Sequence, residues 1–580
     1  MMRGPEGNRS TRRRAALVVM AMLFAGLFAG CGGGEETYIV VTVNRRDAVH
    51  AVTKLQVTLS NAGSMRTDSL ELDMPDQFPV TFSISAPGRD GDLGISIDAL
   101  DTDNVLQGRG SATTTTDADV ATVMLDSADF VVNAIYVNNQ FLSNDFEAVG
   151  LQLAALSNGT WTAAFREDCN PCNVLARRFD AKGEPVRTEL AAGTTQFNVS
   201  TTLTTAGAIP AVASSGLTTL VVWDFFDTVG TGQGVACRSI SETGVGSPGQ
   251  VTISTDAADV VTASPLSNGN FVVTWQSFIT SMQVIRSIIV RPDCTTLTAA
   301  PITVSTVSGS FGARRSHSAA NGAAILYTWV VDGDVRIRQG ANNGTLVGTE
   351  SVLVPKTAAQ EVDHVRISPW GTGFAVAVRW AASTGTGPGK LEVYRVSTTG
   401  TIMGSPILIT DRSGSDFASD KAFGITQRSD GALMVAWHMC ETGPLSCDVY
   451  GRILRPTGVP VGTEFVLATS TGSDQVNPSI AALDATSFVA SWNDSSGNEP
   501  DSNGSAVRAR ILYPVYDDAR SVIGATCGAS APGAPACGED LACAMGTDSV
   551  QRCYAVCTPP SCPGGGTCST VDATTSACTF

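Results

Sequence analysis

Histidine and acidic side chains are spread thinly along this chain, and few stand at spacings that catalysis requires. The four histidines, His50, His317, His364 and His438, fall in separate segments. None stands beside a Gly-x-Ser-x-Gly turn, and the chain has no P-loop or dinucleotide-binding fingerprint. These residues therefore predict neither a catalytic nucleophile nor a cofactor, and we expect no enzymatic activity.

Oxygen donors gather in segment 494–504, where Asp494, Asp501 and Asn503 are the candidates for a calcium site. Calcium binds through several carboxylates at fixed offsets, and neither the EF-hand pattern nor the nonapeptide calcium repeat is present here. A solvated loop is the favoured interpretation, so no metal is predicted.

Cysteine pairs in the middle of the chain predict structural cross-links. Cys169 and Cys172 form a C-x-x-C at an expected hairpin tip, without the βαβ setting of a redox centre. Cys440 and Cys447 form a second close pair. Cys237 and Cys294 are either two buried thiols or a bridge, which would contribute about 4 kcal/mol by the loop-entropy relation.

Residues 516–580 have a different composition, rich in Gly, Pro, Ser and cysteine. Zinc binding is not expected, because this segment has no histidine and lacks the CxxC pairs of zinc ribbons. We expect disulfides to hold the segment, which resembles the small EGF-like modules of extracellular proteins. The eight cysteines that carry this resemblance are Cys527, Cys537, Cys543, Cys553, Cys557, Cys562, Cys568 and Cys578.

An aromatic residue recurs at the end of an apolar strand pattern, at intervals of 51 to 58 residues. A fixed period of this length built on strands indicates a repeat fold, and we expect these aromatic residues to pack between repeats. The seven positions are Phe165, Trp223, Trp275, Trp329, Trp380, Trp437 and Trp492.

Each repeat also carries a turn before the aromatic strand, an arginine on the next strand and a glycine after it. The units resemble the G-F-V-V-x-W…R…G repeats of large bacterial exported proteins, and four strands per unit predict a propeller blade. Residues 135–515 are therefore predicted to form a seven-bladed β-propeller, with 139–143 as the last strand of the seventh blade. An open row of hairpins or two smaller sandwiches is the alternative.

Loops at one end of such a ring are the expected ligand site, because loops on a rigid scaffold tend to carry function. The long loops between second and third strands span 224–234, 381–390, 438–447 and 493–505. We expect the repeated arginines to be exposed or paired with a neighbouring blade. Long polar loops that are merely tolerated are an equally good explanation.

Residues 37–134 show short strands of alternating polarity separated by turn clusters. This pattern predicts an immunoglobulin-like β-sandwich, similar to those that follow the tether in many bacterial surface lipoproteins. The expected fold class is therefore all-β, consisting of this sandwich, the propeller and the disulfide-rich C-terminal module.

The first 30 residues predict an export signal, with five arginines before an apolar run that ends at Gly30-Cys31. The Phe28–Cys31 end resembles the bacterial lipobox, although Leu27 stands one place earlier than the family prefers. The resemblance implies a lipid on Cys31, a Gly-rich tether over 31–36 and location at the bacterial outer membrane, facing the periplasm or the cell surface. A plain secretory signal is the alternative.

Charge limits the partners that this protein can have. Residues 1–30 hold five of the 37 basic and one of the 54 acidic residues, so the chain from Cys31 onward has a formal charge of −21. An acidic surface repels phosphate backbones, and nucleic acid is therefore not expected as a partner.

The leading hypothesis for the function is a lipid-anchored propeller that binds a protein or glycan without catalysis. The alternatives are a polysaccharide-active enzyme using carboxylates around the channel, and a purely structural envelope protein.

Overall fold

A computed structural model describes residues 38–513 and four short strands beyond them. Every regular element in the described part is a β-strand, and no described helix is long and apolar enough to cross a membrane. The structure does not describe residues 1–37, residue 88, or the residues from 514 onward that lie outside those four strands. It also does not describe the internal segments 135–139, 142–151, 168–172, 187–194, 202–208, 227–231, 243–248, 280–281, 307–312, 383–388, 412–422, 441–446, 470–471, 499–500 and 502–503.

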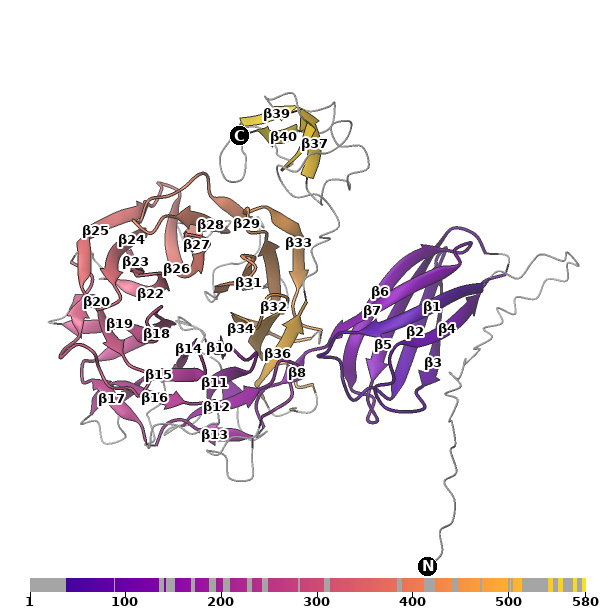
Figure 1. Cartoon of the computed structure of the whole chain (residues 1–580), viewed down its shortest axis with the longest axis horizontal. Coiled ribbons are helices and arrows are strands. Elements are labelled where there is room, and N and C mark those ends of the chain that lie inside the picture. The colour runs from indigo at the N-terminus through magenta and orange to yellow at the C-terminus, as the bar shows by residue number, and fades with distance from the viewer. Residues whose placement is uncertain are drawn as a thin grey trace, which may run out of the picture. The chain divides into compact units, whose positions relative to one another are not determined.

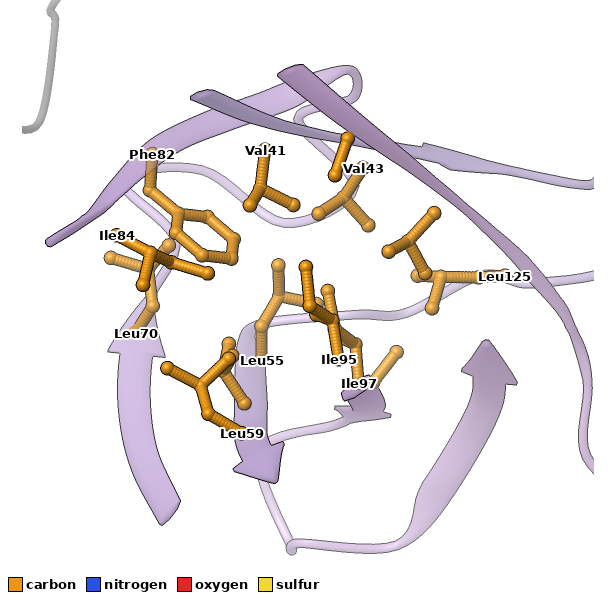
Figure 2. Packing of buried hydrophobic residues seen from close by; sticks show 14 of the residues in the cluster. Val41, Val43, Leu55, Leu59, Leu70, Phe82, Ile84, Ile95, Ile97 and Leu125 are labelled. Atoms are coloured by element: carbon orange, nitrogen blue, oxygen red, sulfur yellow. The ribbon is translucent and has the colours of Figure 1, made fainter. Parts of the chain in front are cut away.

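The chain divides into two compact units, with the boundary between Ala128 and Asp129. The first contains seven strands in the order β3-β2-β5-β6-β7-β1-β4, with β1 and β7 parallel. Alternate residues are buried, as expected for strands with one solvent-exposed face. Figure 2 shows the apolar side chains of these strands converging from facing strands. The strands are β1 Tyr38–Arg45, β2 Lys54–Asn61, β3 Ser64–Glu71, β4 Val80–Ser85, β5 Asp92–Leu100, β6 Leu106–Thr115 and β7 Val120–Ser127.

The second unit contains a ring of seven β-sheets around a central axis (Figure 1). Each of these sheets is one blade with antiparallel strands, and in blades 1 to 6 the four main strands follow chain order. Blades 1 to 4 consist of β10 Leu153–Ala155, β11 Trp161–Glu167, β12 Val174–Phe179 and β13 Gln196–Asn198; β14 Ala211–Ser215, β15 Thr218–Phe226, β16 Gln233–Ile240 and β17 Val251–Ser254; β18 Ala258–Pro265, β19 Phe271–Ile279, β20 Met282–Val290 and β21 Ile302–Thr303; and β22 Arg314–Asn321, β23 Ala324–Val331, β24 Asp334–Ala341 and β25 Leu346–Val354.

Blades 5 and 6 repeat this four-stranded pattern, and blade 7 takes its fourth strand from the start of the unit. The ring is therefore a seven-bladed β-propeller, as the period predicts. The strands are β26 Gln360–Trp370, β27 Gly373–Ala382, β28 Lys390–Val396 and β29 Ile407–Thr410; β30 Phe423–Gln427, β31 Leu433–Cys440, β32 Cys447–Leu454 and β33 Pro460–Val466; and β34 Gln475–Ala482, β35 Phe488–Asp494 and β36 Ala506–Leu512 with β8 Phe130–Val131.

The recurring aromatic residues all lie in the packed layers of the ring, with exposures between 0 and 4%. Trp275 on β19 of blade 3 packs in one cluster with Val222 and Val235 of blade 2. Trp223 of blade 2 packs likewise with Ala164 and Ala176 of blade 1. Each aromatic side chain can therefore fill the space between two blades, which explains its period.

In five blades the repeated arginine of the third strand binds the preceding blade, whereas Arg395 of blade 5 donates to the Pro456 carbonyl of blade 6. Arg238, Arg338 and Arg452 donate to the carbonyls of Val199, Val304 and Ile409, at 3.1, 2.8 and 2.7 Å. Arg177 of blade 1 donates at 2.8 Å to the carbonyl of Val132, and Arg510 of blade 7 donates at 3.0 Å to that of Leu467. The same hydrogen bond thus links blades around the ring, including the junction where it closes.

The strand that closes the ring differs from the one predicted. The prediction for 139–143 is wrong, because β8 pairs with β36, with Val131 opposite Arg508. Residues 140–141 form β9, which pairs with β11 of blade 1. Polar contacts decide the choice, since Arg508 forms ion pairs with Asp129 at 3.2 Å and Asp494 at 2.6 Å. The apolar pattern of 139–143 cannot reveal these contacts.

Two disulfides are present among the described cysteines. Cys237 of blade 2 is bonded to Cys294, which follows β20 of blade 3, and Cys440 is bonded to Cys447 across a hairpin of blade 6. The second was predicted from the sequence, and the first is the bridge that the sequence left open against two buried thiols. In the C-terminal strands β37 Leu541–Met545, β38 Gln551–Ala555, β39 Thr567–Thr570 and β40 Ser576–Thr579, the backbone register places Cys543 opposite Cys553 and Cys568 opposite Cys578. The remaining cysteines, Cys31, Cys169, Cys172, Cys527, Cys537, Cys557 and Cys562, lie outside the described residues.

Candidate functional site at one end of the propeller

Polar side chains gather at the end of the ring where the innermost strands begin and the second strands finish. We call this the entry end. The register fixes it, because Asp259 lies opposite Gln276, His364 opposite Arg379, and Val476 opposite Asn493. It is the end to which the sequence assigns the long loops. Much of those loops lies outside the description, but the residues at which they start are described.

Bulges interrupt several innermost strands at the entry end. Val260, Arg315 and Asn477 have φ angles of 56°, 57° and 58°, which non-glycine residues rarely adopt. The preceding blade holds two of these bulges, because Gln276 Oε1 accepts the Arg315 N–H at 3.2 Å and His438 Nδ1 accepts the Asn477 N–H at 3.3 Å. Gln276 and His438 both follow a recurring tryptophan, so this position has a structural role in these blades.

The ring encloses a central cavity of about 220 Å³. All seven innermost strands contribute to its wall, mostly through small or apolar residues such as Ala213, Ala263 and Ile480. Among the described lining residues there is no carboxylate, so the wall itself offers no acid pair for catalysis. His317 is the titratable residue of the described wall.

Asp224 lies at the entry end directly after Trp223 and is 5% exposed. Its Oδ1 accepts the N–H of Ile209 at 3.2 Å, just before β14, which lines the cavity. Burial raises the pKa of Asp224 to about 7; the Ile209 hydrogen bond opposes this rise, the negative charge of Asp259 on blade 3 adds to it, and the positive charge of Arg166 on blade 1 opposes it. Three blades thus bring together an acid whose pKa lies near 7, a second carboxyl and a guanidinium.

A second group, which we call the blade 4–5 cluster, consists of Arg315, His317, Asp363, His364, Arg366 and Arg379. Arg315 and His317 come from β22 of blade 4, and the others come from β26 and β27 of blade 5. The Asp363 carboxylate lies 3.4 Å from Arg379 Nη1 and 3.6 Å from His364 Nδ1, the latter beyond hydrogen-bonding distance. Arg315 Nη1 donates a hydrogen bond to the Asp363 carbonyl.

Burial governs the charges of this cluster. Burial would raise the pKa of Asp363, but Arg379, His364 and Arg315 together outweigh it and hold that pKa well below its usual range. Burial lowers the pKa of His317 to about 3 and that of His364 well below its ordinary value, with the nearby arginines adding to both shifts. The two imidazoles are therefore neutral at neutral pH, and Asp363 is ionised.

The carboxylates of the two described calcium candidates accept hydrogen bonds from other protein groups. Asp494 accepts hydrogen bonds from Arg508 at 2.6 Å and Gln475 at 3.0 Å, and Asp501 accepts one from Asn133 at 2.7 Å. Asn503 lies outside the described residues. Within the described residues, no group of three His, Cys, Asp or Glu side chains could hold a metal ion.

Sequence reasoning singled out neither Asp224 nor the blade 4–5 cluster, and treated the histidines as isolated. The structure brings His317 and His364 to neighbouring blades, although 47 positions separate them in the sequence. One signal was available, since Arg166, Asp224, Gln276, His438 and Asn493 each follow a recurring aromatic residue. A polar residue at the end of a buried strand, repeated in five blades, marks this end of the ring.

No protein-family model matches the chain, and neither does any curated protein. A solved protein of unknown function from Dyadobacter fermentans is similar over 67% of this chain and 99% of its own, at 11% identity and a TM-score of 0.39. An α-L-arabinofuranosidase from Fusarium graminearum is 8% identical over 52% and 92%, with a TM-score of 0.35. A polysaccharide (ulvan) lyase is 10% identical over 65% and 94%, with a TM-score of 0.39.

These comparisons correct the expectation that the chain is not an enzyme. The solved structures similar to it include an arabinofuranosidase, a polysaccharide lyase and a peptidase. At such low identities and TM-scores, the likenesses assign no reaction or substrate to this chain.

Proposed function

We propose that the propeller is the catalytic domain of a polysaccharide-active enzyme that works at the entry end of the ring. The observation that carries this proposal is the burial of Asp224 beside Arg166 and Asp259, which three successive blades supply. A carboxyl that keeps its proton near neutral pH is what a general acid needs.

In the proposed reaction a glycosidic bond is hydrolysed. Asp224 donates its proton to the glycosidic oxygen as the bond to the anomeric carbon breaks, and Asp259 accepts a proton from the water that attacks this carbon. Arg166 limits the rise in the pKa of Asp224, so the acid can give up its proton at neutral pH.

The test is Asp224→Asn in the full chain, assayed by reducing-end release from a panel of neutral and acidic polysaccharides. We expect at least about a 100-fold loss of kcat with the substrate that wild type cleaves, because general-acid catalysis contributes about 10²–10⁴-fold. Wild-type kcat should fall as the pH rises through about 7, where Asp224 loses its proton.

The matched control is Asp180→Asn. Asp180 caps an outer turn at the opposite end of blade 1, where its carboxylate accepts the N–H of Lys182 at 2.8 Å. This variant should keep wild-type activity. An Asp224→Asn protein with undiminished turnover would refute the catalytic assignment, as would a wild type without activity on any polysaccharide of the panel.

The pKa of Asp224 also has a consequence for stability. The folded pKa is about 7 and the ordinary value is 3.8, so the folded state retains a proton that the unfolded state has lost between these pH values. The contribution of Asp224 to the free energy of unfolding is therefore fully present below pH 3.8 and lost as the pH rises to about 7. In the Asp224→Asn variant, the free energy of unfolding should vary less with pH over this range, whatever the substrate is.

We further propose that the chain is exported and anchored at the outer membrane by a lipid on Cys31. The basic residues, the apolar run and the Gly-Cys junction support this proposal. We also propose an immunoglobulin-like class for the first unit, which is consistent with its seven strands and alternating burial. An EGF-like class for the C-terminal module is consistent with its cross-strand cysteine positions.

The lipid is tested by growing a bacterial expression host with radioactive palmitate. Wild type should carry the label, and Cys31→Ala should lose it and leave the membrane fraction. The control is Cys169→Ala, which keeps the junction intact. Label retained in the Cys31→Ala protein would rule out this anchor.

A further inference from the structure

The blade 4–5 cluster concentrates positive charge at the entry end of the propeller. Arg315, Arg366 and Arg379 are 2 to 5% exposed. Within the cluster, three guanidinium groups lie near one carboxylate, that of Asp363, and both imidazoles are neutral. Bringing like charges together in a buried site is costly and favours an anion beside them.

The arginines are crowded enough to affect one another. Burial lowers the pKa of Arg366 to about 9, and the positive charge of Arg315 adds to this shift. The Arg366 guanidinium also lies 5.5 Å from the centre of the Phe423 ring of blade 6, and its Nη1 donates to the Val365 carbonyl at 3.0 Å. These contacts hold the guanidinium in place, which suits recognition of a planar or tetrahedral oxyanion.

His317 connects this cluster to the central cavity. The residue contributes to the cavity wall, is 2% exposed, and neither of its ring nitrogens has a hydrogen-bond partner in the described structure. Buried polar groups are normally paired, so an imidazole in this position indicates a ligand that supplies the missing partner. A bound anion would also favour protonation of His317, which could then donate to that anion.

We propose that the blade 4–5 cluster binds an oxyanion carried by a sugar residue, and that the substrate is therefore an acidic polysaccharide bearing carboxylate or sulfate groups. This inference rests on the proposed function, since it names the substrate class for the same end of the ring. Arg366 and Arg379 are the residues expected to bind the anion, and His317 is expected to donate a hydrogen bond to it from the cavity wall.

Calorimetric titration of the full chain tests this proposal, using trigalacturonate as the carboxylate probe, a sulfated carrageenan oligosaccharide as the sulfate probe and maltotriose as the neutral probe. At least one acidic probe should bind about tenfold or more tightly than maltotriose, with affinity falling as sodium chloride is raised. The acidic probe that binds more tightly identifies the anion. Equal binding of all three probes by wild type would overturn the proposal.

Arg366→Gln should weaken binding of the preferred acidic probe by about tenfold or more, the loss of one charged hydrogen-bonding group. Arg366→Lys should retain part of the affinity. The matched control is Arg291→Gln, an arginine in an outer turn that donates to the Thr296 carbonyl at 3.0 Å. A folded Arg366→Gln protein with wild-type affinity would refute the assignment.

If Arg366→Gln does not fold, the wild-type melting temperature decides. Sodium galacturonate should raise it above a control of galactose with sodium chloride at equal ionic strength, and no difference would count against the site. Asp224→Asn should still bind the acidic probe. Normal turnover by Asp224→Asn, together with loss of anion binding by Arg366→Gln, would refute only the catalytic assignment of Asp224. Loss of turnover by Asp224→Asn, together with no preference of the wild type for acidic probes, would refute only the anion site.

Discussion

Replacing Trp275 by alanine should lower the free energy of unfolding of the propeller by about 3–5 kcal/mol, the cost of removing a large buried aromatic side chain. Trp275 is 0% exposed and packs in one cluster with residues of blades 2 and 3. Its loss would leave a cavity between two sheets that are fixed by their neighbours on both sides. The rigid ring can therefore collapse little to fill the space.

Phe278→Ala is the control, because Phe278 lies on the same strand and is 51% exposed. Its cost should be below about 1 kcal/mol, as for surface substitutions. Both variants are measured by urea denaturation, followed by the fluorescence of the remaining tryptophans. Similar losses in the two variants would show that the recurring tryptophans do not hold the blades together.

Removing the disulfide between blades 2 and 3 should have an effect of similar size. Cys237 and Cys294 are separated by 57 positions, and the loop-entropy relation gives about 4 kcal/mol for a loop of this length. Both sulfur atoms are buried, so the double variant Cys237→Ala with Cys294→Ala avoids placing hydroxyl groups in an apolar layer. The measurement is the free energy of unfolding of the oxidised protein.

The second disulfide is the matched control. Cys440 and Cys447 are separated by seven positions, for which the same relation gives about 2.5 kcal/mol. The double alanine variant at this pair should therefore be clearly less destabilised than the variant at the first pair. The opposite order would mean that local strain or packing, rather than loop length, determines the stabilisation.

Much of the fold could be predicted from the sequence, because its signals are local and repeated. A propeller blade places an aromatic residue in the same packed layer each time, so Trp223, Trp275 and Trp329 recur at nearly constant intervals. The positions of Cys237 and Cys294, near the third strands of neighbouring repeats, allow a disulfide but leave two buried thiols as the alternative. Strand identity and blade number are therefore encoded in periodicity.

Only the tertiary structure decided which strand closes the ring and which polar groups meet. Closure by β8 depends on Asp129 meeting Arg508, residues 379 positions apart, and no local pattern encodes such a pair. The same holds for Asp224 with Asp259, and for His317 with Arg366, which come together because successive blades turn about one axis. Periodicity determines the blades, whereas the chemistry at the entry end depends on side chains that differ from blade to blade and become neighbours only when the ring is closed.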